Sequence, residues 1–155
     1  TLWNRTRSKA AALAAQIPGL AVADDLQAAV HAADIVISAT MATDPVIRGE
    51  WLRPGQHINL IGAYRPDMRE ADDTALQRAR VYVDSFDTTL DHIGELKIPL
   101  QTGAITRSDV RADFYDLDAF DRGGAGDITL FKNGGGAHLD LITSRYILDR
   151  WLERS

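Results

Sequence analysis

The sequence predicts an α/β fold in which a parallel sheet is doubly wound by helices. Two observations support this prediction. Short runs rich in β-branched residues alternate with helix-like segments along the chain, which is the order expected when helices cross over between parallel strands. The run at 35–40 (IVISAT) is continuously apolar or β-branched, a pattern typical of a strand that is buried on both faces.

The composition is that of a globular protein of about one domain. The 155 residues are 45% hydrophobic and 25% charged, and the net charge of −5 gives no general attraction to nucleic acid or anionic lipid. Cysteine is absent, which excludes disulfides, thiolate nucleophiles and cysteine-ligated metal centres. The longest apolar run is too short to span a bilayer, and no cleavable signal is visible. We therefore expect a cytoplasmic protein with neither membrane nor nucleic-acid partners.

The beginning of the chain predicts a strand end and two helices. Residues 1–6 (TLWNRT) lack an initiator methionine and resemble the end of a β-strand, which predicts an N-terminal truncation. The next elements are an alanine-rich helix over 6–16 that ends at Pro18-Gly19, an edge strand over 20–22, and a helix over 26–32 with Asp24-Asp25 as its N-cap.

The alternation continues beyond residue 50 and loosens after Asp84. Trp51 and Trp151 lie in apolar helical settings, which predicts core positions for both. Gly134-Gly135-Gly136 marks a sharp break between the last strand and the last helix. The remaining elements are strands at 57–62 and 81–84 around a helix over 67–80, a helix over 88–96, a strand over 127–132 and a helix over 138–154.

Three residues at the start of the chain could select the cofactor. In a dinucleotide-binding sheet the second strand ends beside the adenosine ribose, and a neutral residue followed by arginine there accommodates a 2′-phosphate. Asn4, Arg5 and Thr6 fit that pattern, with an amide, a guanidinium and a hydroxyl close to a helix N-terminus. Until these residues are located in a fold, an ordinary surface arginine next to a helix N-cap is an alternative explanation for the same pattern.

Two loops that follow predicted strands could border a ligand. Thr40, Met41 and Ala42 follow one strand, and their small size would let backbone groups approach a cofactor, although an ordinary strand exit is an equal alternative. The segment 61–70 (IGAYRPDMRE) places a glycine just beyond the next strand and then crowds functional side chains together. Arg65 or Arg69 could hold a substrate carboxylate, and capping of the next helix is the favoured role for Asp67.

The histidines do not predict a metal site. His31, His57, His92 and His138 form no pair at helical i, i+4 spacing, so we expect no bound metal. His138 follows the glycine run and could face a cofactor, or it could be solvated or cap the helix. The acidic segment 113–121 is interpreted as a solvated loop.

Taken in order, these motifs resemble the ornithine cyclodeaminase/μ-crystallin family. The resemblance implies a Rossmann-type nucleotide domain over 1–126, followed by a C-terminal strand and helix over 127–155 that return to a dimerisation and substrate domain. The similar stretches, which lie in the family's order over nearly the whole chain, are 3–6 (WNRT), 33–47 (ADIVISATMATDPVI), 51–72 (WLRPGQHINLIGAYRPDMREAD), 81–85 (VYVDS) and 127–141 (DITLFKNGGGAHLDL).

Residue 64 bears on the type of reaction. Cyclodeaminases of the family carry an aspartate, thought to act as acid and base, at the position that Tyr64 occupies here, and a tyrosine cannot replace a carboxylate base at neutral pH. The resemblance thus favours reductases of cyclic ketimines such as Δ1-pyrroline-2-carboxylate or Δ1-piperideine-2-carboxylate, or enzymes that interconvert 2-oxo acids and amino acids. The WNRT stretch is similar to that of the NADP-preferring, μ-crystallin-like branch.

The family's glycine-rich phosphate loop, its first strand, and the lysine and arginines that bind the substrate carboxylate would lie before residue 1. A doubly wound sheet without its first strand would leave strand edges without partners. We therefore expect the rest of the protein in the natural chain, where it would form a homodimer, or a piece that does not fold as an independent catalyst.

The resulting hypothesis is NADPH-dependent reduction of a small imino acid, with NAD(H) as the less favoured cofactor. Alternatives are an ammonia lyase of the cyclodeaminase type that uses NAD, a non-catalytic NADPH-binding protein similar to the crystallins, and an inactive remnant. The residues assigned are Asn4, Arg5 and Thr6 for the 2′-phosphate, Thr40, Met41, Ala42, Ile61, Gly62, Ala63 and Asn133 for the rest of the cofactor, and Tyr64 and Arg65 for the substrate side.

Overall fold

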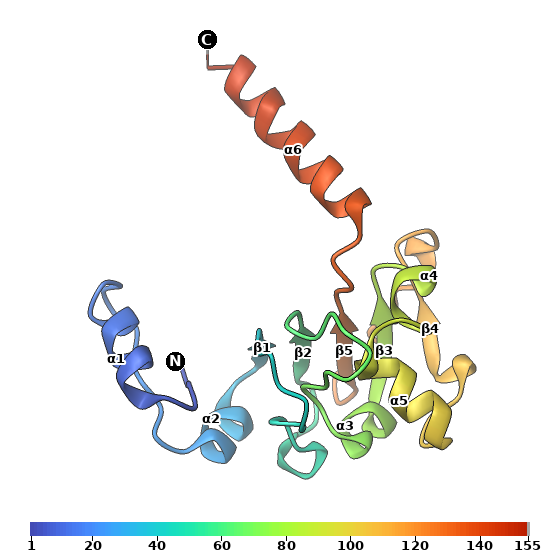
Figure 1. Ribbon diagram of the computed structural model, residues 1–155, viewed down its shortest axis with the longest axis horizontal. Coiled ribbons are helices and arrows are strands. Elements are labelled where there is room, and N and C mark those ends of the chain that lie inside the picture. Colours follow the sequence, from blue (N-terminus) through green and yellow to red (C-terminus); the bar gives the residue numbers. More distant parts are fainter. Residues whose placement is uncertain (155) are drawn as a thin grey trace.

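A five-stranded sheet, parallel throughout, organises the molecule (Figure 1). The computed structural model describes residues 1–154 of the chain. The strand order is β1-β2-β5-β3-β4, so the last strand in sequence lies in the middle of the sheet. This arrangement confirms the predicted α/β fold with helical crossovers. The strands are β1 (Ile35–Ser38), β2 (His57–Leu60), β3 (Ala79–Val83), β4 (Val110–Ala112) and β5 (Ile128–Lys132).

The described chain contains six α-helices and three short 3-10 helices besides the strands. The α-helices are α1 (Arg7–Ala14), α2 (Leu26–Ala32), α3 (Asp73–Arg78), α4 (Phe86–Thr89), α5 (Gly94–Thr102) and α6 (Ala137–Leu152). The 3-10 helices are η1 (Gly49–Trp51), η2 (Arg107–Asp109) and η3 (Leu117–Ala119).

The sequence predicted the boundaries of some helices correctly and those of others wrongly. Asp25 caps α2 as expected, because its carboxylate accepts the Ala28 N–H at 3.1 Å. The helix expected over 67–80 is shorter: α3 begins only at Asp73, and Asp72 caps it by accepting the Ala75 N–H at 2.9 Å. The helix expected over 88–96 is replaced by α4 and α5, since residues 90–93 lie between them.

The register of the three central strands brings their carboxyl ends to one level. Leu60 of β2 lies opposite Lys132 of β5, and Lys132 lies opposite Val83 of β3. The loops that follow these strands therefore emerge side by side at one edge of the sheet. In open parallel sheets this is the edge at which ligands bind.

The apolar core lies on one face of the sheet. Alternate residues of the strands pack there against residues of α2, α3 and α5, which removes their apolar surface from water. Trp51 packs against this cluster from η1, as predicted. Fully buried members include Ile58, Leu60, Val81, Val83, Leu130, Leu76 and Leu96.

Strand β1 differs from the prediction of burial on both faces. Val36 and Ser38 are buried, but the side chains of Ile35 and Ile37 are 62% and 65% exposed. The reason is topological, because β1 is the edge strand and the described helices cover only the face that carries Val36.

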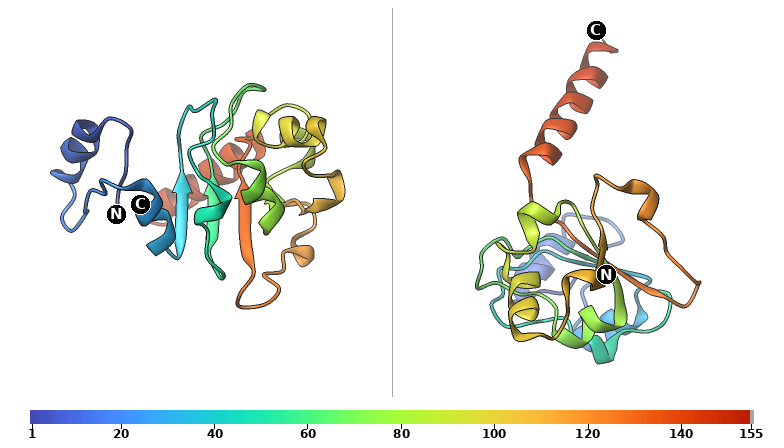
Figure 2. Two further views of the ribbon diagram at one scale, coloured as in Figure 1. Left: turned by 90° about the horizontal axis from the view of Figure 1, so that it is seen from below. Right: turned by 90° about the vertical axis from the view of Figure 1, so that its right-hand side faces the viewer.

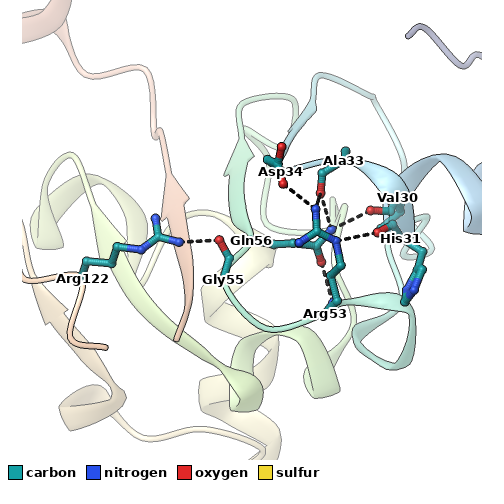
Figure 3. A network of polar contacts seen from close by, with 8 residues as sticks. All are labelled: Val30, His31, Ala33, Asp34, Arg53, Gly55, Gln56 and Arg122. Atoms are coloured by element: carbon teal, nitrogen blue, oxygen red, sulfur yellow. Dashed lines mark hydrogen bonds and ion pairs between the residues drawn. The ribbon is translucent and has the colours of Figure 1, made fainter. Parts of the chain in front are cut away.

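A polar network fastens the end of α2 to the starts of β1 and β2 (Figure 3). The buried Gln56 side chain donates to Val30 O at 2.7 Å and to Ala33 O at 2.6 Å, and its oxygen accepts the Arg53 N–H at 2.7 Å. Arg53 also pairs with Asp34 at 2.5 Å. These contacts satisfy the carbonyls at the C-terminus of a short helix and lie at the amino edge of the sheet, opposite the ligand-binding edge.

Both ends of the chain stand away from the sheet (Figures 1 and 2). The N-terminal segment and α1 lie beyond α2, where Leu2 pairs with Val22 in an isolated parallel bridge. The strands expected at the start of the chain and over 20–22 are thus reduced to this single pair. Helix α6 projects from the sheet, and Trp151 is 71% exposed, so its predicted core position is wrong. No helix within residues 1–154 combines the length and hydropathy needed to cross a membrane.

Candidate functional site

An open cavity of about 540 Å³ lies at the carboxyl edge of the sheet. It is bounded by the loop after β2, the loop after β5 and the first turns of α6. The lining residues contribute a phenol, a carboxamide, two hydroxyls and a carboxylate around apolar and glycine surface; they are Ile61, Tyr64, Asn133, Gly134, Gly135, Leu139, Asp140, Thr143 and Ser144.

The loops that follow β1 and β2, here called the exit loops (39–42 and 61–63), are joined by the carboxylate of Glu70. Glu70 Oε1 accepts hydrogen bonds from Ser38 Oγ at 2.6 Å, Thr40 N at 2.6 Å and Thr40 Oγ1 at 2.9 Å. Glu70 Oε2 accepts from Gly62 N at 2.7 Å. The side chain is fully buried, so these charge-assisted bonds form where water does not compete.

Gly62 allows the two exit loops to touch. A Cβ at this position would overlap Thr40 N and Thr40 O, and it would lie 2.7 Å from Glu70 Oε1. The close approach that this glycine permits is therefore an approach between two parts of the protein.

A second buried carboxylate holds the backbone of Glu70. Glu95 Oε2 accepts the Glu70 N–H at 2.7 Å, and Glu95 Oε1 accepts the Ala71 N–H at 2.9 Å. Burial raises the pKa of Glu95 to about 7, although these two N–H groups and the Lys132 ammonium act to lower it. Glu95 comes from α5, so this helix is tied to the loop before α3.

Lys132, the last residue of β5, supplies positive charge beneath the exit loops. Its ammonium is fully buried and donates to Leu60 O at 3.3 Å. Burial lowers the pKa of Lys132, whereas Glu95, Glu70 and Asp84 raise it. The buried cation thus compensates part of the negative charge that the surrounding carboxylates place in the protein.

Asp84 shapes the glycine loop (133–136). Its Oδ1 accepts the N–H groups of Ser85 at 3.0 Å and Gly134 at 2.9 Å, and Oδ2 accepts that of Gly136 at 3.4 Å. Asn133 stabilises the turn of this loop, because its side-chain oxygen accepts the Gly135 N–H at 2.7 Å. These hydrogen bonds fix the backbone conformation of the glycine loop, which forms one wall of the cavity.

The family model of the ornithine cyclodeaminase/mu-crystallin family matches residues 1–155. The chain belongs to this family.

Two similar relatives are named as reductases of Δ1-pyrroline-2-carboxylate and of ketimines. The chain is 53% identical over 154 residues to a Δ1-pyrroline-2-carboxylate reductase of Paracoccus denitrificans. This alignment covers 95% of this chain and 49% of the relative. It is 38% identical over 152 residues to the mouse ketimine reductase mu-crystallin, covering 97% of this chain and 46% of the relative. The chain thus spans about half the length of these relatives.

A solved structure has the same architecture. The Thermococcus litoralis Δ1-pyrroline-2-carboxylate reductase in complex with NADH and L-proline superposes with a TM-score of 0.82 at 30% identity. The alignment covers 98% of this chain and 50% of that one. The Rossmann-like fold and the family resemblance drawn from the sequence are confirmed.

The structure brings part of the predicted site of this family member together. Ile61, Tyr64 and Asn133 line the cavity. Thr40 and Gly62 lie beside it but direct their N–H groups to Glu70. Of the three remaining loop predictions, the Met41 side chain is 67% exposed and Ala63 is buried. Ala42 accepts the Arg69 N–H at 2.9 Å through its carbonyl.

The substrate-side residues form a small charged group at the rim. The Arg65 guanidinium lies 6.0 Å from the centre of the Tyr64 ring and binds Asp67 through two hydrogen bonds of 3.0 Å. Asp67 therefore pairs with Arg65 and does not cap a helix, so its predicted capping role is wrong. The arginine beside it lowers the pKa of Asp67.

Asn4, Arg5 and Thr6 lie at the N-terminus of α1, outside the cavity lining. Asn4 Oδ1 accepts the Thr6 N–H at 2.8 Å, which closes a turn before the helix. Arg7, which follows them, is paired with Asp24 through its Nε.

The buried residues Glu70, Glu95, Lys132 and Asp84 were not singled out by sequence reasoning. Glu70 stood in a crowded motif without a role, and Lys132 ended an otherwise apolar strand. The acidic segment 113–121 was expected to be solvated, yet Asp113 is buried and accepts the Phe86 N–H at 3.0 Å. Within residues 1–154 no group of three or more metal-ligating side chains is placed to hold an ion.

Proposed function

We propose that the complete gene product reduces a small cyclic imino acid of the Δ1-pyrroline-2-carboxylate or Δ1-piperideine-2-carboxylate type with NADPH. In this reaction a hydride is added to the imine carbon and a proton to the imine nitrogen, while NADPH is oxidised to NADP+. The chain would contribute the nucleotide-binding part of the enzyme.

The cavity at the carboxyl edge is the observation on which this proposal rests. Its position, where parallel strands end, is the position at which doubly wound sheets bind ligands. Relatives named as Δ1-pyrroline-2-carboxylate and ketimine reductases match nearly the whole chain, and a solved relative was crystallised with NADH and L-proline. L-Proline is the product expected from reduction of Δ1-pyrroline-2-carboxylate.

The lining suits the nicotinamide half of a dinucleotide. Gly135 has a φ of 72°, and a Cβ there would meet nothing within 4 Å, so the glycine loop leaves open space at the wall of the cavity. Asn133 and the backbone of Ile61 could hold the carboxamide and ribose side of the group. When bound, the cofactor supplies the hydride, and the protein supplies position and electrostatics.

The residues that line the cavity include no cation to neutralise the carboxylate of the proposed substrate. Asp140 is the charged residue among the nine lining residues, and no basic side chain is among them. Arg65 at the rim is engaged by Asp67. We therefore propose that Tyr64 and Arg65 border the substrate, and that a basic group outside residues 1–154 neutralises its carboxylate.

The preference for NADPH is proposed from Asn4, Arg5 and Thr6. They precede α1, whose first N–H groups are available to an anion as at other helix N-termini. Arg5 could pair with a 2′-phosphate, whereas NADH offers no such group.

We also propose that α6 packs against a substrate and dimerisation part of a homodimer, with 1–126 as the nucleotide unit and 127–155 as the returning segment. The helix supports this because apolar side chains cover much of its surface in the described chain; they are Leu141, Ile142, Tyr146, Ile147, Leu148, Trp151 and Leu152.

The decisive assay mixes the complete gene product with Δ1-pyrroline-2-carboxylate or its six-membered analogue and NADPH or NADH, and follows loss of absorbance at the nicotinamide band. We expect turnover that prefers NADPH. Ammonia release from ornithine without reduction of either imine would replace the reductase by a cyclodeaminase. Tight dinucleotide binding without any turnover would favour a binding protein.

A further inference from the structure

Four hydrogen-bond donors from two strand ends converge on one buried carboxylate. Ser38 is the last residue of β1, Thr40 lies in the exit loop that follows it, and Gly62 lies in the exit loop after β2. Backbone N–H groups of Thr40 and Gly62 are among the four, so the carboxylate fixes main-chain positions as well as side chains. A carboxylate suits this task because it accepts at both oxygens and donates at neither.

The carboxylate is itself held from a third direction. The Glu70 N–H donates to Glu95, and the Glu70 carbonyl accepts the N–H groups of Val46 at 2.9 Å and Ile47 at 2.8 Å. The backbone of residue 70 is thus attached to α5 and to the loop that continues from the first exit loop. Because the backbone of Glu70 is held in place, its side chain can hold both exit loops at fixed positions.

The two exit loops are in direct backbone contact. The overlap that a Cβ at Gly62 would produce with Thr40 shows that the backbones are in contact at this point. Ile61, the neighbour of Gly62, lines the cavity. A change in the spacing of the exit loops therefore moves the cavity wall.

We propose that Glu70 is a positioning residue of the nucleotide site: its carboxylate sets the spacing of the exit loops and so the wall that the bound dinucleotide meets. This inference rests on the proposed function only in placing a dinucleotide in the cavity. It assigns Glu70 no contact with the substrate and no part in proton transfer.

Glu70→Gln is the informative substitution, since it keeps the shape and replaces one acceptor by an NH2 group. Whichever way the amide lies, this group faces at least one of the N–H donors of Thr40 and Gly62. Hydrogen exchange of these two amides should be slow in the wild type and at least about tenfold faster in the variant.

The matched control is Asp72→Asn, also a change from carboxylate to amide. Asp72 accepts N–H groups from Gly49 at 2.8 Å and Ala75 at 2.9 Å, so it holds η1 and α3 and does not contact the exit loops. Both N–H groups go to Asp72 Oδ1, which the asparagine oxygen can replace, so the control should change stability little and should alter neither exchange at Thr40 and Gly62 nor the Kd of NADPH.

Dinucleotide titration followed by fluorescence supplies the functional readout, at a temperature where all variants are folded. For E70Q we expect the Kd of NADPH to rise about tenfold, which corresponds to about 1.4 kcal/mol. The KM for NADPH should rise in parallel, with kcat at saturation lowered less than about threefold. If E70Q does not fold, Ser38→Ala removes one donor and should raise the Kd about threefold.

The outcomes separate this proposal from the reductase assignment. Unchanged Kd, or unchanged exchange of the Thr40 and Gly62 amides in E70Q, overturns the positioning role. Altered exchange and Kd in a protein that reduces no imine would support the positioning role and remove the proposed reaction. A wild-type protein that binds neither NADPH nor NADH would overturn both.

Discussion

Replacing Gly62 by alanine tests whether the exit loops are held in contact. The added Cβ would overlap the backbone of Thr40 and lie 2.7 Å from Glu70 Oε1, and neither group is the end of a flexible side chain with room to turn away. Over-packing of a close-packed site typically costs about 1–3 kcal/mol. Loss of one charge-assisted hydrogen bond to Glu70 adds about 1–2 kcal/mol. We therefore expect Gly62→Ala to lower the free energy of unfolding by about 3 kcal/mol.

Urea unfolding of the complete gene product, monitored by circular dichroism, measures this loss. Gly124→Ala is the matched control, because a Cβ at Gly124 meets nothing within 4 Å and its φ is not in the left-handed region. That variant should stay within about 0.5 kcal/mol of the wild type. A loss below about 1 kcal/mol in Gly62→Ala would refute the reasoning, since the loops would then have room to separate.

Three further predictions concern other residues of the site. Burial raises the pKa of Glu95 from 4.5 to about 7, so the protonated form favours the folded state. The contribution of Glu95 to the unfolding free energy should therefore be complete below pH 4.5 and should be lost, by about 3 kcal/mol, as the pH rises from 4.5 through about 7. Urea melts of Glu95→Gln should lack this part of the pH dependence, and its persistence would contradict the assignment. Arg5→Ala should raise the KM for NADPH about tenfold in steady-state assays and leave that for NADH nearly unchanged; equal effects on both cofactors would exclude a 2′-phosphate contact. Asp84→Asn places an NH2 group opposite either the Gly134 or the Gly136 N–H, so hydrogen exchange in the glycine loop should accelerate and kcat should fall about tenfold; an unaltered loop would mean that Asn133 alone orders it.

The fold was predictable because its signals are local and repeated. Alternating strands and helices lie close to their expected ranges, and α2 matches its predicted limits with Asp25 as its cap. Failures occurred where tertiary contacts override local pattern. Asp67 precedes a helix-like sequence, but the Arg69 N–H goes to Ala42 and that of Glu70 to Glu95. These partners are distant in sequence, so periodicity could not reveal that the helix begins at Asp73.

The candidate site was predictable only in outline. Cavity residues such as Ile61, Tyr64 and Asn133 follow strands, and the rule that ligands meet parallel sheets at strand ends identifies them. The buried charges lack such a rule. Glu95 sits within an amphipathic helix and Lys132 at the end of a strand, and single charged residues in those settings are usually exposed. Their roles emerge only when the elements are packed.

The buried carboxylates at this edge of the sheet hold loops in place. Glu70, Glu95 and Asp84 are buried, and each accepts N–H groups from the loops that it holds. While a carboxylate holds its loop it is not placed to exchange protons with a substrate, so the proton that the proposed reduction adds to the imine nitrogen has to come from another group. Tyr64 lines the cavity, and the family resemblance implies that cyclodeaminases carry an aspartate at this position. Hydride transfer needs a cavity wall that stays fixed while cofactor and substrate meet, and we propose that Glu70, Glu95 and Asp84 provide it by holding the loops at this edge of the sheet.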